Sequence, residues 1–242
     1  MATTHGKNVD VFINEFDLTA FFNNMDLNRE AENPETTTFS KNDRTFIAGL
    51  KGGNVSLSGF FDSAAGASDE VLNATLGAAA DRVVTIGPGG TAIGDVTYLF
   101  RTRTSSYNVS GSVDSVVEVT ADLLANREID RGVALHNLTA ETVTGDSNAT
   151  SVDGLGVTTN GGTGHLHVTA VSTPTTLDVD IEDSADDAAW LALTGGTFTQ
   201  VTTAAISEQI TVAAGQAVRQ YLSTAWVIVG TSYTFAVAFA RR

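Results

Sequence analysis

Hydrophobic and polar residues alternate along several segments of this chain. In Val55–Phe60, Val117–Leu124 and Tyr233–Ala240, larger apolar residues or Gly occupy every second position, with polar or small residues between them. This period of two predicts β-strands, and in an antiparallel sheet it indicates one buried and one solvated face. The pattern therefore predicts a mainly β protein.

Further apolar segments bounded by turn residues also predict strands. They lie at Val9–Ile13, Arg82–Ile86, Val96–Phe100, Tyr107–Ser110, His165–Val171, Leu177–Glu182, Ile206–Val212 and Arg219–Val229. In the second half of the chain, strands and turn signals recur at regular intervals, which is typical of a β-sandwich. The segment Thr139–Gly164 is poor in large apolar residues and predicts long loops.

One segment, Ser68–Leu76, predicts a short α-helix. Ser68 is suited to cap its N-terminus, and two acidic residues follow in the first turn, where the helix dipole favours negative charge. Gly77 suits the left-handed position after the last turn. The apolar face consists of Val71, Leu72 and Leu76. A helix this short must dock on a sheet to be stable.

The composition of the chain changes around Asp130–Gly132. Before this point the predicted strands flank one helix; after it come a loop-rich stretch and a separate set of strands. The sequence therefore predicts two domains. Residues 1–131 would form a β-barrel or sandwich with the flanking helix, and residues 132–242 would form a second, all-β sandwich.

Composition and charge exclude several classes of protein. The chain has 242 residues, enough to bury a core, and its formal net charge of −15 opposes binding to nucleic acid. It has no cysteine, which excludes disulfides, thiolate catalysis and cysteine zinc sites. The N-terminus does not resemble a signal peptide, and no apolar run has the ~18 residues of a membrane helix. These features predict a soluble protein made in the cytoplasm.

Two histidines offer candidate chemistry. His165 and His167 lie two positions apart on a predicted strand, so both imidazoles would share one face at metal-chelating spacing. No third ligand is near them in the sequence, and a solvated face opposite Leu166 and Val168 is favoured over a metal site.

An acidic turn is the other candidate. Asp183–Asp187 offers the oxygen ligands that Ca²⁺ prefers, but the spacing differs from known calcium loops, and a solvated turn is favoured. Trp190, next to this turn, is the one exposed-looking aromatic residue considered for a ligand. No set of positioned acids, bases or nucleophiles indicates an enzyme. The sequence therefore predicts a structural protein without a cofactor or metal.

The segment Asn28–Arg44 is polar and rich in acidic residues and threonine. It is too polar to be buried alone and too long for an ordinary hairpin turn. Long loops in compact β domains usually carry function, and the predicted function here is to grip another subunit. Phe39 is the large apolar side chain of the segment and the predicted anchor of that contact.

Several linked motifs in the chain resemble the tail tube proteins of long-tailed bacteriophages. ETTTF at 35–39, FIAGL at 46–50 and SLSGFFD at 56–62 occur in this order, and FAVAFARR closes the sequence at 235–242. The resemblance is best from about Lys7 to Leu138. It implies a tail-tube-type β-barrel or sandwich with one flanking helix, assembled into rings that are commonly hexameric. The rings stack into a hollow tube that carries DNA at infection.

The resemblance also implies partners and a location. The chain would be a structural virion protein of the tail, assembled in the host cytoplasm. Its partners would be copies of itself, the tape-measure, tail-terminator and baseplate or tip proteins, and viral DNA that passes through the lumen without specific binding. No membrane is implied. The contact between rings would be made by Glu32, Glu35, Thr37, Phe39, Lys41, Asp43 and Arg44. The alternative is a carbohydrate-binding or adhesin-like β-sandwich protein.

Overall fold

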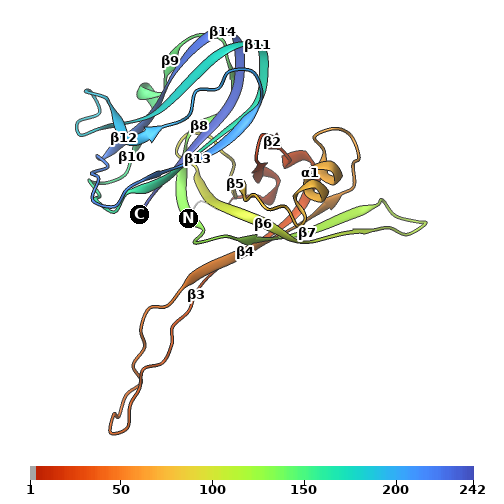
Figure 1. Ribbon diagram of the computed structural model, residues 1–242, viewed down its shortest axis with the longest axis vertical. Helices are drawn as coiled ribbons and strands as arrows, with labels where there is room; N and C mark the ends of the chain where they lie inside the picture. The colour runs from red at the N-terminus through yellow and green to blue at the C-terminus, as the bar shows by residue number, and fades with distance from the viewer. Residues whose placement is uncertain (1–3) are drawn as a thin grey trace. The chain divides into compact units, whose positions relative to one another are not determined.

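The computed structural model describes residues 4–242 and shows a mainly β chain (Figure 1). Within the described residues α1 (Ser68–Thr75) is the single α-helix, so the predicted fold class, strands with one short helix, is confirmed. The chain forms two compact units. Unit 1 consists of the segment that ends at Ala20, together with Arg82–Leu99 and Asp130–Arg242, and unit 2 consists of Phe21–Asp81 and Phe100–Ile129.

The two units alternate along the sequence. The chain passes from unit 2 to unit 1 between Ile129 and Asp130, next to the predicted boundary, but unit 1 also includes two earlier segments. Whether residues 1–131 and 132–242 fold as separate domains depends on their independent stability. That division stays a prediction.

Unit 1 is built from strands that follow the order β12-β11-β14-β8-β6-β5-β1-β2 in the sheet, with the shorter β9, β10 and β13 beside β14 and β11. The strands are β1 (Asp10–Ile13), β2 (Phe16–Asp17), β5 (Arg82–Gly87), the first residues of β6 (Val96–Ser110), β8 (Asp130–Glu141), β9 (Gly145–Asp146), β10 (Val152–Asp153), β11 (Gly162–Ser184), β12 (Leu191–Thr197), β13 (Ile206–Val212) and β14 (Tyr221–Arg241). Short 3₁₀ turns lie at Gly6–Asn8 and Asn148–Thr150, and a third, Thr19–Phe21, spans the junction with unit 2.

The strands β11 and β14 are long antiparallel partners. Their register runs from Gly162 opposite Arg241 to Ser184 opposite Tyr221. The sequence pattern predicted two strands in each of these segments, which is wrong. The register of β11 shifts between Pro174 and Thr176, in the gap between the two predicted strands, and such irregularities bend a strand without ending it. An interruption in the hydrophobic pattern therefore marked a bend and not a turn.

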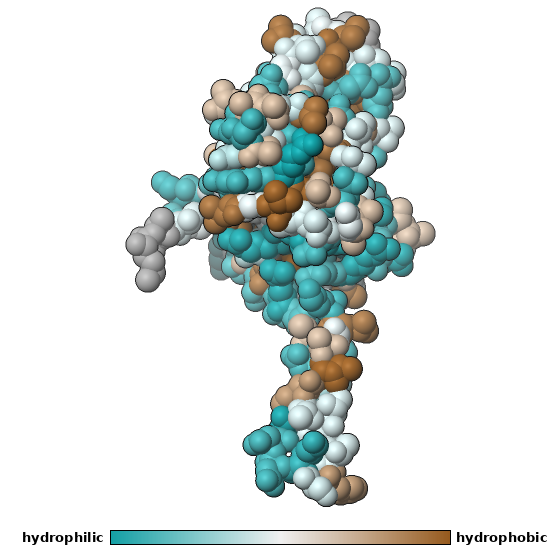
Figure 2. Space-filling model, turned by 90° about the vertical axis from the view of Figure 1, so that its left-hand side faces the viewer, coloured by the Kyte–Doolittle hydropathy of each residue, from teal (hydrophilic) through white to brown (hydrophobic). Residues whose placement is uncertain are grey.

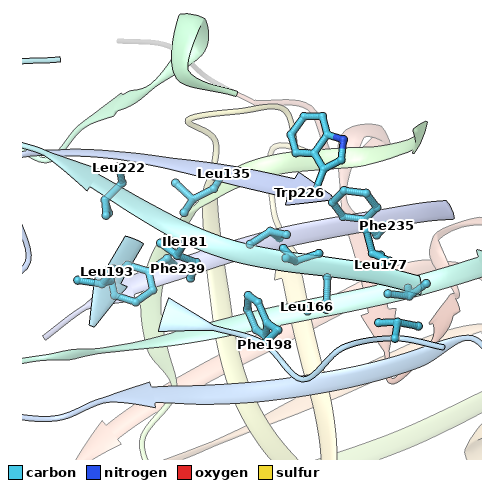
Figure 3. Close-up of a cluster of buried hydrophobic side chains, with 14 of the residues drawn as sticks. Leu135, Leu166, Leu177, Ile181, Leu193, Phe198, Leu222, Trp226, Phe235 and Phe239 are labelled. Carbon is cyan, nitrogen blue, oxygen red and sulfur yellow. The ribbon is translucent and has the colours of Figure 1, made fainter. Parts of the chain in front are cut away.

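The core of unit 1 lies along one side of β11 and β14 (Figure 3). Its members are apolar and nearly inaccessible to solvent, and they include Leu135, Leu166, Leu177, Ile181, Leu193, Phe198, Leu222, Trp226, Tyr233, Phe235 and Phe239. Trp226 and Tyr233 belong to this core. The indole N–H of Trp226 donates to the carbonyl of Val143 at 2.9 Å, so its polar end is satisfied.

The predicted solvated face at His165 and His167 is wrong. Both side chains are buried, with 0% and 1% exposure, and so is Leu166 between them. This part of β11 is covered on both sides, because Thr85 of β5 contacts the histidines while the leucine packs into the core. Strands buried on both faces lose the alternation of polar and apolar residues that marks a solvated face.

Unit 2 is a four-stranded antiparallel sheet with α1 packed on it. Its strand order is β3-β4-β7-β6, from β3 (Phe22–Ala31), β4 (Lys51–Phe60), β7 (Glu118–Ala125) and residues 100–110 of β6. The predicted strands Val55–Phe60 and Val117–Leu124 fall within β4 and β7. The strands predicted at Val96–Phe100 and Tyr107–Ser110 are parts of the single strand β6.

The helix α1 lies where it was predicted, but its N-terminus differs. The N-cap is Ala67, which makes no side-chain capping bond. The hydroxyl of Ser68 instead donates to the carbonyl of Phe60 at 2.8 Å and accepts from the N–H of Asp62 at 3.1 Å. It thus ties the helix to the end of β4. Gly77 has a φ of 68°, in the left-handed region, as predicted. No helix of residues 4–242 is long and apolar enough to cross a membrane.

Candidate assembly surface

One face of the unit 2 sheet is apolar and packs against α1. Val55, Leu57, Val119, Ala121 and Leu123 alternate along β4 and β7 with 0–1% exposure. Because side chains on a strand point alternately to opposite faces, these residues share the helix side of the sheet. The helix covers them with its own buried side chains Val71 and Leu72. This pairing of sheet and helix gives unit 2 its core.

A hydrogen bond from a tyrosine adds to this packing. The phenol of Tyr107 on β6 donates to the carboxylate of Asp69 on α1 at 2.5 Å. Burial of the phenol and its bond to this carboxylate raise the pKa of Tyr107. The hydroxyl therefore keeps its proton and holds the helix against the strand.

The opposite face of the sheet is polar. Asp122 of β7 lies at its centre and accepts hydrogen bonds from the hydroxyls of Ser56 and Ser106, each at 2.6 Å. The bonds from Ser106 and Ser56 lower the pKa of Asp122, because they favour the charged carboxylate. By the cross-strand register, this face also carries two exposed apolar side chains, Phe60 and Leu124, among the polar or charged residues Asn24, Asp26, Asn28, Asn54, Ser58, Arg103, Asn108, Glu118 and Thr120.

The outer edge of the sheet is open at β3. This strand pairs with β4 from Phe22 opposite Gly59 to Ala31 opposite Lys51. In residues 4–242 no second strand pairs with it. Its outward N–H and C=O groups are therefore available to a strand of another molecule. The sequence did not reveal β3, because apolar and polar residues in Phe16–Leu27 follow no single period.

The loop predicted at Asn28–Arg44 differs in the structure, because Asn28–Ala31 belong to β3. Residues 32–50 form an arm that extends β3 and β4. Backbone hydrogen bonds join its two legs: the N–H of Glu32 donates to the carbonyl of Leu50 at 2.8 Å, and that of Thr36 to Thr45 at 2.7 Å. Each leg has about nine residues, so the arm reaches roughly 30 Å. It is held by its own backbone, because it has no packed core.

The arm is accessible to solvent along its length. Every residue from Asn28 to Ala48 is exposed, and Phe39 near the tip is 103% exposed. Figure 2 shows hydrophobic surface along the arm, which extends downward in that view. The large apolar side chains there are Phe39, Phe46, Ile47 and Leu50. Exposed apolar groups on a projecting element are typical of an interface.

All residues predicted at the inter-ring contact lie on this arm, namely Glu32, Glu35, Thr37, Phe39, Lys41, Asp43 and Arg44. Glu35 forms a β-bridge with Phe46, and the hydroxyl of Thr37 accepts from the N–H of Thr45 at 3.0 Å. These two residues therefore shape the arm. Their contact with another ring stays a prediction, as does that of the charged residues.

The carboxylates of the acidic turn predicted as a candidate site bind backbone N–H groups of unit 1. In the acidic turn, Asp186 accepts from the N–H groups of Ala188 and Ala189, at 3.1 and 3.0 Å. These bonds lower the pKa of Asp186. Asp183 is buried and accepts from the N–H of Arg219 at 2.8 Å. No group of three or more metal-ligating side chains occurs in the part of the chain that the structure describes.

A second exposed apolar feature was missed in the sequence. The connection between β6 and β7 carries Val113 and Val116, with 103% and 63% exposure. The signal in the sequence is three valines close together, Val113, Val116 and Val117, at a turn that is otherwise polar. The predicted strand Val117–Leu124 includes only the last of them.

No family model matches the sequence, and no curated protein sequence is significantly similar to it. Solved structures do match. The tail of an empty gene transfer agent particle is 15% identical, over 52% of this chain and 97% of the other, with a TM-score of 0.43. The SPP1 tail tube is 12% identical, over 52% and 78%, with a TM-score of 0.44. The SPP1 Dit protein is 14% identical, over 96% and 98%, with a TM-score of 0.38.

The matched structures are tail and adsorption-apparatus components. All three TM-scores are below 0.5.

Proposed function

We propose that this chain is a structural subunit of a phage-type tail, and that its copies form stacked rings around a hollow channel. One observation carries the proposal: unit 2 combines a sheet with an open outer strand and a projecting arm that has no packing partner in the described subunit. Open strand edges and exposed apolar arms are usually covered in the functional state. The simplest partner that could cover the open strand and the arm is another copy of the same chain.

Rings would form by pairing of strands between neighbouring copies. β3 and β6 are the outer strands of the four-stranded sheet, so β3 of one copy can pair next to β6 of the following copy. Such a contact is heterologous, and it closes into a ring when the rotation between copies closes. Six copies per ring is what the resemblance to tail tube proteins implies.

The polar face of the sheet suits the wall of the channel. Around Asp122 it presents hydroxyl and amide groups, and the guanidinium of Arg103 is engaged by Asp81 at 2.9 Å. A surface without an excess of free positive charge gains little from releasing the counterions of DNA. DNA would therefore pass along this face without binding to it.

Stacking of the rings would use the arm. Its exposed Phe39 would be the anchor, and the predicted polar residues from Glu32 to Arg44 would form the rim of the contact. The tape-measure, terminator and baseplate proteins would meet the tube inside and at its ends. In this proposal the protein belongs to the virion tail, is assembled in the host cytoplasm and has no enzymatic role.

The test is the assembly state of the purified chain. Sedimentation over a range of protein and salt concentrations, with electron micrographs of the same samples, should show rings or tubes that grow with concentration. Replacing Glu32–Asn42 by a short Gly/Ser bridge should leave the subunit folded and remove stacking, because these residues contribute nothing buried. A monomer of ~25 kDa under all conditions would refute the proposal, and glycan binding by that monomer would favour the alternative.

A further inference from the structure

The helix-side face of the unit 2 sheet is only partly covered by α1. The register of β4, β6 and β7 continues the buried row of Val119 outward to Phe61, Val109 and Val117. These three side chains are 36–44% exposed, whereas Val119 is 0% exposed. They form an apolar surface beside the β6–β7 turn, which carries the exposed Val113 and Val116. We call these five residues together the hairpin strip. It consists of Phe61, Val109, Val113, Val116 and Val117.

The surroundings of the hairpin strip carry one sign of charge. Residues 60–70 and 105–117 contain four acidic side chains and no lysine, arginine or histidine. The acidic residues are Asp62, Asp69, Glu70 and Asp114. A partner that covers the strip should therefore present apolar side chains next to positive charge.

The arm has this combination. Its exposed apolar side chains are Phe39, Phe46, Ile47 and Leu50. Near its tip Lys41 and Arg44 flank Asp43, which leaves residues 36–48 with a net charge of +1. No ion pair within the described residues engages these two cations.

An arm cannot reach the hairpin strip of its own subunit. The arm leaves the sheet at Lys51, which is the first residue of β4. The strip begins at Phe61, which directly follows the last residue of β4. The ten residues of β4 separate these points by roughly 30 Å, and the arm and the β6–β7 hairpin extend from opposite ends of the strand (Figure 1). The occupant of the strip must come from a second molecule.

We propose that the hairpin strip of one copy receives the arm of a second copy. Phe39 and its apolar neighbours on the arm pack against Phe61, Val109 and Val117, while Lys41 and Arg44 lie near the acidic border. Because the donor and acceptor surfaces differ, each copy can give an arm and receive one, and the contact repeats without closing on itself. This inference rests on the proposed function, since it names the surface that the arm contacts.

Cross-linking can test the contact, because the chain has no cysteine. The double variant Thr38→Cys/Val113→Cys keeps Phe39 and would be assembled and then oxidised, and denaturing gels would show covalent oligomers. A matched control is Thr38→Cys/Leu155→Cys, since Leu155 is 90% exposed but lies on unit 1. The first pair should give about tenfold more covalent oligomer than the control, because thiols held in contact have a high effective concentration.

A charge reversal gives a second readout that needs no new bond. Lys41→Glu should raise the concentration needed for assembly about twofold to fivefold, as expected for losing an exposed ion pair. Adding Asp114→Lys should restore the original concentration. Tubes that form without preferential cross-linking and without rescue by the second substitution would overturn the assigned contact and leave the proposed function intact. Absence of rings and tubes under all conditions would overturn both.

Discussion

Acidification should destabilise unit 1, because His167 is fully buried in its neutral form. Its Nδ1 is 2.6 Å from the carbonyl of Asn14 and therefore carries the proton. Its Nε2 then accepts from the hydroxyl of Thr85 at 2.8 Å. That hydroxyl in turn accepts from Nδ1 of His165 at 2.9 Å. A second proton on Nε2 of His167 would remove the hydrogen bond that the Thr85 hydroxyl donates to it.

The size of the effect follows from the pKa of His167. Burial lowers it from the ordinary 6.5 to about 4, and the bond to Asn14 opposes this only in part. Between these values the unfolded chain binds a proton that the folded chain does not, so the free energy of unfolding falls as the pH falls. The loss begins near pH 6.5 and is complete below about pH 4, where it amounts to roughly 3 kcal/mol. Burial lowers the pKa of His136 as well, which acts in the same direction.

Urea unfolding at several pH values would measure this loss. Both tryptophans, Trp190 and Trp226, lie in unit 1, so their fluorescence reports on that unit. His167→Asn is the matched control, because an amide nitrogen can replace Nδ1 as the donor to Asn14. The free energy of unfolding of the variant should depend less on pH between pH 4 and 6.5, because the proton taken up by His167 on unfolding is no longer involved.

Two results would refute this reasoning. One is a slope of stability against pH that is the same in His167→Asn and in the parent chain. The other is an NMR titration in which His167 of the folded protein gains its proton near pH 6.5. Either would mean that burial does not keep this imidazole neutral.

Three further substitutions test other contacts. Thr85→Val should lower the free energy of unfolding of unit 1 by about 1–3 kcal/mol in urea titrations, because two buried imidazoles lose a partner, whereas Thr85→Ser should stay close to the parent. Gly59→Ala should loosen the pairing of β3 and β4, since the added Cβ would lie 2.0 Å from the carbonyl oxygen of Phe21. Faster amide hydrogen exchange in β3 would show this loosening, and Ser58→Ala is the control. Phe39→Ala should leave the melting temperature of the subunit unchanged, because the side chain is fully exposed, and should weaken stacking in sedimentation; a lowered melting temperature would place the residue in a core.

The sequence predicted best where one physical requirement decides the residue pattern. Alternation at Val55–Phe60 and Val117–Leu124 identified two strands of unit 2, because one face is buried and the other is wet. Acidic residues after Ser68 and a glycine at Gly77 located the helix. The exposed arm was also predicted, since a long polar segment with one phenylalanine has no reason to be buried.

The failures have a common cause: they depend on partners that are distant in the sequence. His165 and His167 are buried because Thr85, about eighty residues earlier, satisfies their nitrogens. Ser68 bonds to the carbonyl of Phe60 and is not the N-cap, because the end of β4 lies beside the helix. The alternation of the two units along the chain could not be read from composition, which detects only successive changes.

The order of segments in the two units has a consequence for synthesis on the ribosome. All of unit 2 has been translated once residue 129 is made, whereas unit 1 needs β14, which ends at Arg241 and pairs with both β8 and β11. At usual rates of elongation the intervening 112 residues (241 − 129) take roughly 6–20 s. For that time a nascent chain can carry a complete arm and an open β3 edge beside an unfinished unit 1. The open edge and the arm of unit 2 are then accessible on neighbouring chains of one messenger before unit 1 of either chain is complete.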